Sequence, residues 1–386
     1  MAVQTASRGP AAETGETVEG GPSSFRPSLV GWVARGLVWA GIAWLVLLFP
    51  LGREPFELQR FSEAVIFGII GLSLNVLLGY VGQISLGHQA FVGIGAFTTA
   101  YIVTEQNLSF WVGVAAAVAV GGGQALVLGG VSLRITGLYF ALVTLAYGLV
   151  AEKNIFQIQE LTGGGLGQPA PKPQGFESDF RYYYLCLVFL AIVLWVDWRM
   201  MRTKSGRALL ALRENPQVAS TFGVNVRLLT LFAFVVSGAF AGLGGALLAH
   251  NDTRVSPETW SFNLALIFVI MTVVGGLRSR AGVVIGSAFF ALIGYLLDQV
   301  PDFALGLGSL ELISVHEGLI KVPGAPELTP EIARLVIGPV LLLLTLTLTP
   351  GGIGQQIRPV VSWLRGRRFD LKDRGLKEVQ ISDVRA

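Results

Sequence analysis

The chain has 386 residues, of which 52% are apolar and only 14% are charged, and its mean hydropathy is +0.63. Soluble globular domains average about 25% charged residues, so this composition excludes that class and indicates a polytopic membrane protein. The net charge of +3 is modest. A single cysteine, Cys186, excludes an intrachain disulfide and a cysteine-based metal cluster.

Residues 1–30 are rich in Gly, Pro, Ser, Thr and Glu and predict a disordered tail, because no basic stretch precedes an apolar run as in a signal peptide. Ten apolar segments follow, each near the length of about 20 residues that a helix needs to cross a bilayer. We therefore predict an all-α membrane domain over residues 31–350 and a basic tail over 351–386. The expected spans are residues 31–50, 61–80, 84–103, 109–130, 137–155, 182–198, 228–250, 262–278, 281–299 and 331–349.

The distribution of basic residues predicts the orientation of these spans. Ten spans place both termini on one side, and the segments on that side hold 20 of the 28 Lys and Arg residues. By the positive-inside rule this side is the cytoplasm, so we expect both termini to be cytoplasmic in a plasma (inner) membrane. Two long outer loops, residues 157–181 and 301–330, are either spacers or contacts for an extracytoplasmic partner.

Residues 199–227 form a long polar interruption between two membrane-length segments, and we call them the coupling loop. Asn215 followed by Pro216 predicts a helix cap with proline at the first helical position, and Gly223 predicts the helix end. The resulting helix has about two turns, too few to be stable alone. Ala219 keeps it slim, which suits docking against another protein, although a simple connector remains the alternative.

Six glycines occur between residues 71 and 101, in the run GLSLNVLLGYVGQISLGHQAFVGIGAFTTAY. Glycine in a membrane helix allows close helix packing, or allows a helix to break where it lines a cavity. The first interpretation assigns these residues no function. The second predicts a translocation path with polar contacts from Asn75, Ser85, His88 and Gln89.

Other chemistries have little support in the sequence. Carboxylates are scarce within the spans, which disfavours a proton- or sodium-driven carrier. No Gly-Lys pair occurs, so the phosphate-binding loop of an ATPase is missing, and no catalytic grouping is seen. His88 has no second ligand nearby, so no metal site is predicted. Two predicted inner hairpins, residues 79–85 and 275–281, occupy equivalent places, each ending one span and starting the next.

Five ordered blocks carry a resemblance to a known family: residues 85–97 (SLGHQAFVGIGAF), 133–148 (LRITGLYFALVTLAYG), 161–167 (LTGGGLG), 206–226 (GRALLALRENPQVASTFGVNV) and 273–289 (VVGGLRSRAGVVIGSAF). Together they are similar to the permease subunits of branched-chain amino-acid ABC importers, specifically the longer of the two paired permeases.

This resemblance implies an importer built from two permeases, two ATPase subunits and an extracytoplasmic solute-binding protein. The chain would carry no cofactor and no ATPase site, because ATP would bind to the partner subunits. The coupling loop would dock on the ATPase through Glu214, Asn215, Pro216, Ala219 and Gly223. Expected substrates are Leu, Ile and Val or related amino acids, with urea or short amides as the alternative. A stand-alone channel or secondary carrier is the alternative from another class.

Overall fold

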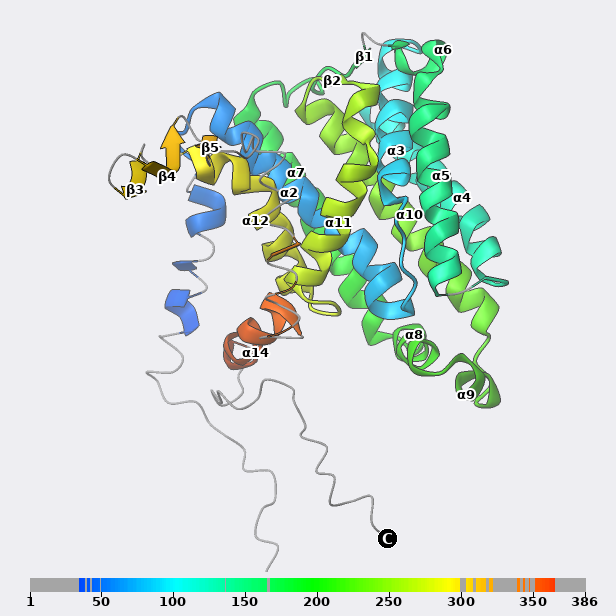
Figure 1. Cartoon of the computed structure of the whole chain (residues 1–386). Helices are drawn as coiled ribbons and strands as arrows, with labels where there is room; N and C mark the ends of the chain where they lie inside the picture. The colour runs from blue at the N-terminus through cyan, green and yellow to red at the C-terminus, as the bar shows by residue number, and fades with distance from the viewer. Residues whose placement is uncertain are drawn as a thin grey trace, which may run out of the picture.

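The computed structural model describes residues 35–38, 40–41, 44–48, 50–135, 137–164, 167–298, 303–307, 310–316, 319–321, 339–340, 343, 347 and 351–364. Within these ranges the chain is a bundle of helices, and β-structure is confined to two small sheets (Figure 1). The prediction of an all-α polytopic membrane protein is confirmed for this part of the chain.

Eight of the ten predicted spans correspond to helices. They are α2 (Pro55–Leu74) continued by the π-helix η2 (Asn75–Val81), α3 (His88–Thr104), α4 (Phe110–Ser132), α5 (Leu138–Lys153), α7 (Asp179–Arg202), α10 (Val226–Asn251), α11 (Phe262–Gly275) and α12 (Arg280–Asp298). Five helices within the described ranges are long and apolar enough to cross a membrane, and α11 and α12 add two shorter apolar helices.

The two remaining predicted spans are described only in part. Span 31–50 includes the π-helix η1 (Trp44–Leu48), whose Val46 carbonyl accepts a hydrogen bond from Tyr183 of α7 at 2.9 Å. Span 331–349 lies outside the described residues except for 339, 340, 343 and 347. The predicted tails, residues 1–30 and most of 351–386, also lie outside them.

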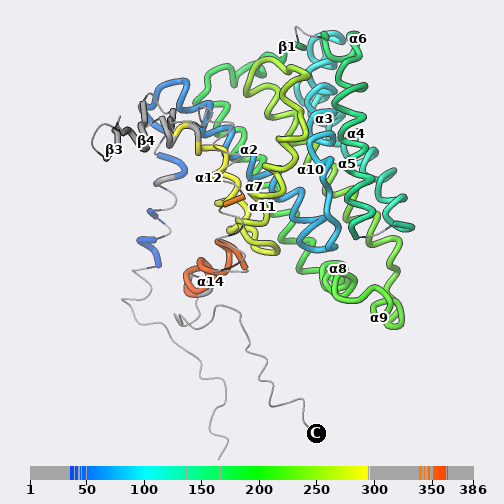
Figure 2. The backbone as a smooth tube through the Cα atoms, in the orientation of Figure 1, coloured from blue at the N-terminus to red at the C-terminus, as the bar shows by residue number. Residues whose placement is uncertain are grey.

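Two predicted span boundaries differ from the structure for local reasons. α2 begins at Pro55, six residues before the expected start, because proline is favoured in the first helical turn. α3 begins at His88, whereas residue 84 was predicted, because residues 82–87 form no helix. Figure 2 shows this stretch rising from the end of η2 to the start of α3.

α2 is the centre of the bundle and contacts α7, α10, α11 and α12. α10, which contacts α2, also packs closely with α3 and α4 through small residues. A Cβ atom on Gly245 would lie 1.9 Å from the Val92 carbonyl oxygen, and one on Gly242 would lie 2.2 Å from that of Ala117. Such spacing brings helix backbones into contact, as is usual in membranes. The packing interpretation of the glycine-rich run is also confirmed at Gly87, whose Cβ would meet the Thr144 carbonyl oxygen at 1.9 Å.

The remaining elements lie at the two ends of the bundle (Figure 1). The inner end, as we call it, carries α8 (Lys204–Glu214), α9 (Pro216–Thr221) and α14 (Gly352–Leu364). At the opposite, outer end lie η3 (Ile155–Gln157), α6 (Gln159–Thr162), η5 (Pro257–Trp260) and the antiparallel pair β1 (Gln168–Pro169) and β2 (Arg254–Val255). A three-stranded antiparallel sheet, β3 (Phe303–Leu307), β4 (Leu310–His316) and β5 (Leu319–Lys321), occurs within the predicted outer loop 301–330.

Both ends of the described chain lie at the inner end. The guanidinium carbon of Arg35 lies 5.4 Å from the ring centroid of Trp363 in α14, a cation–π contact. An even number of membrane crossings separates these two residues if each predicted span crosses once. This contact is consistent with the predicted ten spans.

Candidate functional site

The coupling loop carries a short capped helix, α9, at the inner end. The Asn215 side-chain oxygen Oδ1 accepts hydrogen bonds from the backbone N–H groups of Gln217 at 3.0 Å and Val218 at 3.1 Å. Pro216 occupies the first turn. Two of the unpaired donors at the helix start are thereby satisfied, so the predicted N-cap is confirmed.

The C-terminal end of α9 turns at Gly223. This residue has φ +77°, and its N–H donates to the Ser220 carbonyl at 3.0 Å. The Val224 N–H donates to the Ala219 carbonyl at 3.3 Å. These two bonds form a Schellman motif, which needs a left-handed residue at this position and therefore favours glycine. The predicted helix end is confirmed.

α9 buries one face and exposes an apolar one. Ala219 is 2% exposed, whereas Val218 is 50% and Phe222 is 82% exposed. Residues four apart lie on the same side of a helix, so Val218 and Phe222 form an apolar projection at the inner end. This projection offers apolar surface that a partner protein could cover.

The structure adds a helix that the sequence interpretation missed. α8 spans Lys204–Glu214 and buries Leu209 and Leu212, three residues apart, against the bundle. That spacing was the available signal. The resemblance in the sequence assigns Glu214 to docking on the ATPase. In the structure Glu214 is the last residue of α8 and directly precedes the α9 cap, and its Oε1 accepts a hydrogen bond from Nη2 of Arg278 at 2.7 Å.

The guanidinium of Arg278 lowers the pKa of Glu214, first through this hydrogen bond and second through its charge. Arg213, next to Glu214, donates from Nη1 to the carbonyl of Gly79 in η2. Its pKa is lowered by partial burial and by the nearby Arg278. Charged groups of the coupling loop are therefore held against the inner ends of the spans.

The predicted path residues Asn75, Ser85, His88 and Gln89 are all buried, with at most 1% exposed. The structure gives them different contacts. Asn75 Oδ1 accepts a hydrogen bond from the backbone N–H of Arg278 at 2.9 Å, and His88 Nε2 lies 2.7 Å from the Ser73 hydroxyl. Asn75 therefore binds the inner turn between α11 and α12, whereas His88 binds α2.

Asn75 and His88 each leave one side-chain nitrogen, Nδ2 and Nδ1, without a partner among the described residues, and Ser85 and Gln89 make no side-chain hydrogen bond there at all. The hydroxyl of Ser85 and both side-chain amide atoms of Gln89 have no hydrogen-bond partner among the described residues. Buried polar atoms normally have partners, because an unpaired one costs about 1–3 kcal/mol. Both residues flank the start of α3, where residues 82–87 are not helical. We call the non-helical connection 82–87 between η2 and α3 the helix break, and buried polar atoms flank it.

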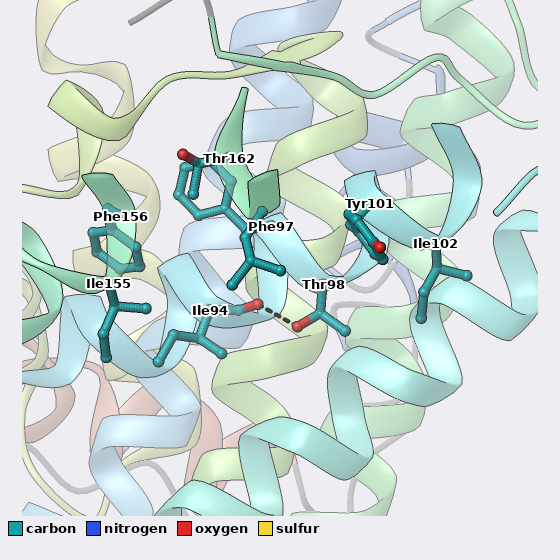
Figure 3. Close-up of a pocket in the computed structure, with 9 residues that line it drawn as sticks. Ile94, Phe97, Thr98, Tyr101, Ile102, Ile155, Phe156 and Thr162 are labelled. Atoms are coloured by element: carbon teal, nitrogen blue, oxygen red, sulfur yellow. Dashed lines mark hydrogen bonds between the residues drawn. The ribbon is translucent and has the colours of Figure 1, made fainter. Parts of the chain in front are cut away.

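An apolar cavity lies beside the outer half of α3 (Figure 3). Its volume is about 300 Å³, and it separates α3 from η3 and α6. The hydroxyl of Thr98 is directed to the Ile94 carbonyl at 2.6 Å, and that of Thr162 to the Ile158 carbonyl at 2.9 Å. The cavity therefore offers apolar contact and little hydrogen bonding. Its lining is Ile94, Phe97, Thr98, Tyr101, Ile102, Ile155, Phe156, Leu161 and Thr162.

Comparison with known proteins agrees with the resemblance noted in the sequence. Residues 58–345 match a family described as branched-chain amino acid transport system / permease component. The chain is 30% identical to the high-affinity branched-chain amino acid transport system permease protein LivM of Escherichia coli, over 81% of each chain. It is 29% identical to LivM of Salmonella typhimurium, over 78% of this chain and 79% of that protein.

A more distant relative comes from an archaeon. The probable branched-chain amino acid transport permease protein LivH of Methanocaldococcus jannaschii is 28% identical, over 64% of this chain and 73% of that protein. No solved structure matches the chain.

Proposed function

Because the chain belongs to the family of branched-chain amino acid transport permeases, a family of multi-pass membrane proteins, we propose that it imports Leu, Ile and Val as one subunit of an ATP-driven transporter. The substrate assignment rests on the LivM and LivH relatives, whose names specify branched-chain amino acid transport. We place the protein in the plasma membrane with its inner end and both termini in the cytoplasm, as the distribution of Lys and Arg indicates.

The exposed apolar face of α9 is the main support for an ATP-driven mechanism. A two-turn helix gains little stability on its own, yet this one has a complete N-cap and a complete C-cap. It holds Val218 and Phe222 outward, at 50% and 82% exposure. A rigid apolar projection on the cytoplasmic side is suited to an apolar groove on an ATPase subunit. A connector would need neither feature.

The proposed assembly contains this chain, a second permease, two ATPase subunits and an extracytoplasmic solute-binding protein. ATP binds and is hydrolysed in the ATPase subunits, and this chain acts as the transporter subunit. The exposed apolar faces of α4, α5 and α7 provide surface for lipid and for the second permease. They include Trp111, Tyr139, Leu142, Ile192 and Trp195.

We place the solute path at the break between η2 and α3. Ser85 and Gln89 provide three buried polar atoms without partners there. A membrane interior retains such groups where solute or water reaches them, because in lipid an unpaired polar group is costly. Charged residues are scarce in the spans. An uncharged path of this kind suits a zwitterionic amino acid, whose net charge is zero.

The test is transport by the complete complex in proteoliposomes with its binding protein. We expect ATP-dependent uptake of radiolabelled leucine, competed by isoleucine and valine. Phe222→Asp should abolish association of the ATPase while the permease still inserts normally. Ser220→Ala, an exposed change on the same helix, should retain association. Uptake of urea in place of leucine would overturn the substrate assignment, and leucine uptake without ATP would overturn the ATP-driven mechanism.

A further inference from the structure

We propose that Arg278 is a positioning residue that transmits movement of the coupling loop to the helix break, by joining Glu214 of α8 to Gly79 of η2. The inference rests on the proposed function, because it assumes that ATP hydrolysis moves the coupling loop. It concerns the connection inside this chain, between the surface that docks and the path that opens.

Arg278 contacts two segments at once, η2 through two residues and α8 through one. Its backbone N–H donates to Oδ1 of Asn75 at 2.9 Å, its Nε to the Gly79 carbonyl at 3.4 Å, and its Nη2 to Oε1 of Glu214 at 2.7 Å. The residue has φ +68°, a conformation that side-chain-bearing residues rarely adopt. Such a conformation persists only where its surroundings hold it.

Gly79 is the point at which the two arginines of this connection meet. Its carbonyl accepts hydrogen bonds from Arg213 of α8 and from Arg278 of the turn between α11 and α12. There is no room for a side chain, since a Cβ at Gly79 would lie 2.2 Å from Asn75 Oδ1. Three residues later, Gly82 has φ +79° and the non-helical stretch begins.

This arrangement links α8 directly to the start of the break. A guanidinium is planar and rigid, so two guanidinium groups on one carbonyl transmit a displacement better than flexible contacts would. A shift of α8 therefore moves Gly79, and with it the connection to Ser85 and Gln89.

A contribution to folding stability does not explain the Arg278–Glu214 ion pair. The Arg278 and Glu214 side chains are 43% and 72% exposed, and exposed ion pairs contribute little to folding. Removing the pair should leave the bundle intact while releasing the coupling loop. The role that remains for it is to fix the position of α8 relative to η2 and the inner turn.

The experiment compares Arg278→Ala, Arg278→Glu, Glu214→Arg and the exchange Glu214→Arg with Arg278→Glu. In the reconstituted complex, leucine uptake and phosphate release are measured together. We expect each single variant to hydrolyse ATP while the ratio of uptake to hydrolysis falls about fivefold or more. The exchange restores an ion pair but places at 278 a carboxylate, which cannot donate to the Gly79 carbonyl, so its ratio should stay as low as that of its parents. The control Arg60→Ala removes an arginine of similar exposure from its ion pair with Glu63 at the outer end, and should keep the wild-type ratio.

A second measurement does not depend on transport. Amide hydrogen exchange of the permease alone in nanodiscs should be faster at residues 82–87 in Arg278→Ala than in wild type or Arg60→Ala. Unchanged exchange there, together with a wild-type ratio in the single variants, would overturn the inference. A charge exchange that restores the wild-type ratio would also overturn it, because the ion pair would then suffice without the bond to Gly79. Failure of the proposed function would show separately, as a wild-type complex that imports no leucine.

Discussion

The hydroxyl of Tyr80, in η2, donates a hydrogen bond to Oδ2 of Asp197, in α7, across 3.0 Å. Asp197 is fully buried, and Arg280 of α12 donates to the same oxygen and to the Asp197 backbone carbonyl. Three helices that are far apart in the sequence are joined at this carboxylate near the inner end.

Replacing Asp197 by Ala should destabilise the bundle strongly. Arg280 would lose its partner while remaining largely buried, and breaking such a pair costs about 3 kcal/mol. Tyr80→Phe removes one hydrogen bond and should cost about 1 kcal/mol. The midpoint of thermal unfolding in detergent would measure both changes. Arg53→Ala, which removes an exposed pair with Glu57, should leave the midpoint almost unchanged. Equal midpoints for all three variants would contradict this account of Asp197.

Substitutions at Gly223 should weaken docking according to how well each residue tolerates a positive φ. No atom lies within 4 Å of a Cβ placed there, so only the backbone conformation opposes a side chain. Gly223→Val should cost roughly 1–2 kcal/mol and loosen α9, whereas Gly223→Asn should cost less. We expect ATPase pull-down and leucine uptake to fall in the order glycine, asparagine, valine, at equal permease abundance. Loss that is the same for asparagine and valine would point to side-chain contact instead of conformation.

Glycines on the helix surfaces should separate into two classes. Gly245→Ala places a Cβ 1.9 Å from the Val92 carbonyl oxygen, so α3 and α10 must move apart. We expect a severe loss of permease in the membrane. Gly123→Ala on α4 meets no atom within 4 Å and should be neutral or stabilising by up to about 1 kcal/mol, because alanine is the better helix former. Immunoblots of membrane fractions decide this, and similar abundance of the two variants would refute the close packing.

Much of the fold was predictable, because the hydropathy and the length of each apolar segment indicate a membrane helix without reference to the rest of the chain. The caps of α9 were likewise local, since Asn215, Pro216 and Gly223 act on their immediate neighbours. Residues 82–87 were harder to assign, because an apolar segment with glycines fits either a helix or a break. The partner of Glu214 was not predictable, since Arg278 lies 64 residues away and meets it only after the bundle has packed.

Gln89→Met separates the two interpretations of the helix break. Methionine has a similar volume and carries no amide, so the variant removes two buried atoms that lack partners. If Gln89 only packs, the change should stabilise the protein and leave transport at the wild-type rate. If Gln89 lies on the path, stability should be equal or higher while leucine uptake falls at least about tenfold, the effect of losing roughly 1.4 kcal/mol of interaction with the solute. His88→Ala is the comparison, because it also removes a hydrogen bond to Ser73 and should lower stability as well as uptake. We expect the path result for Gln89, measured as uptake per permease molecule beside the thermal midpoint. A more stable variant with full uptake would assign Ser85 and Gln89 to packing and move the solute path elsewhere in the bundle.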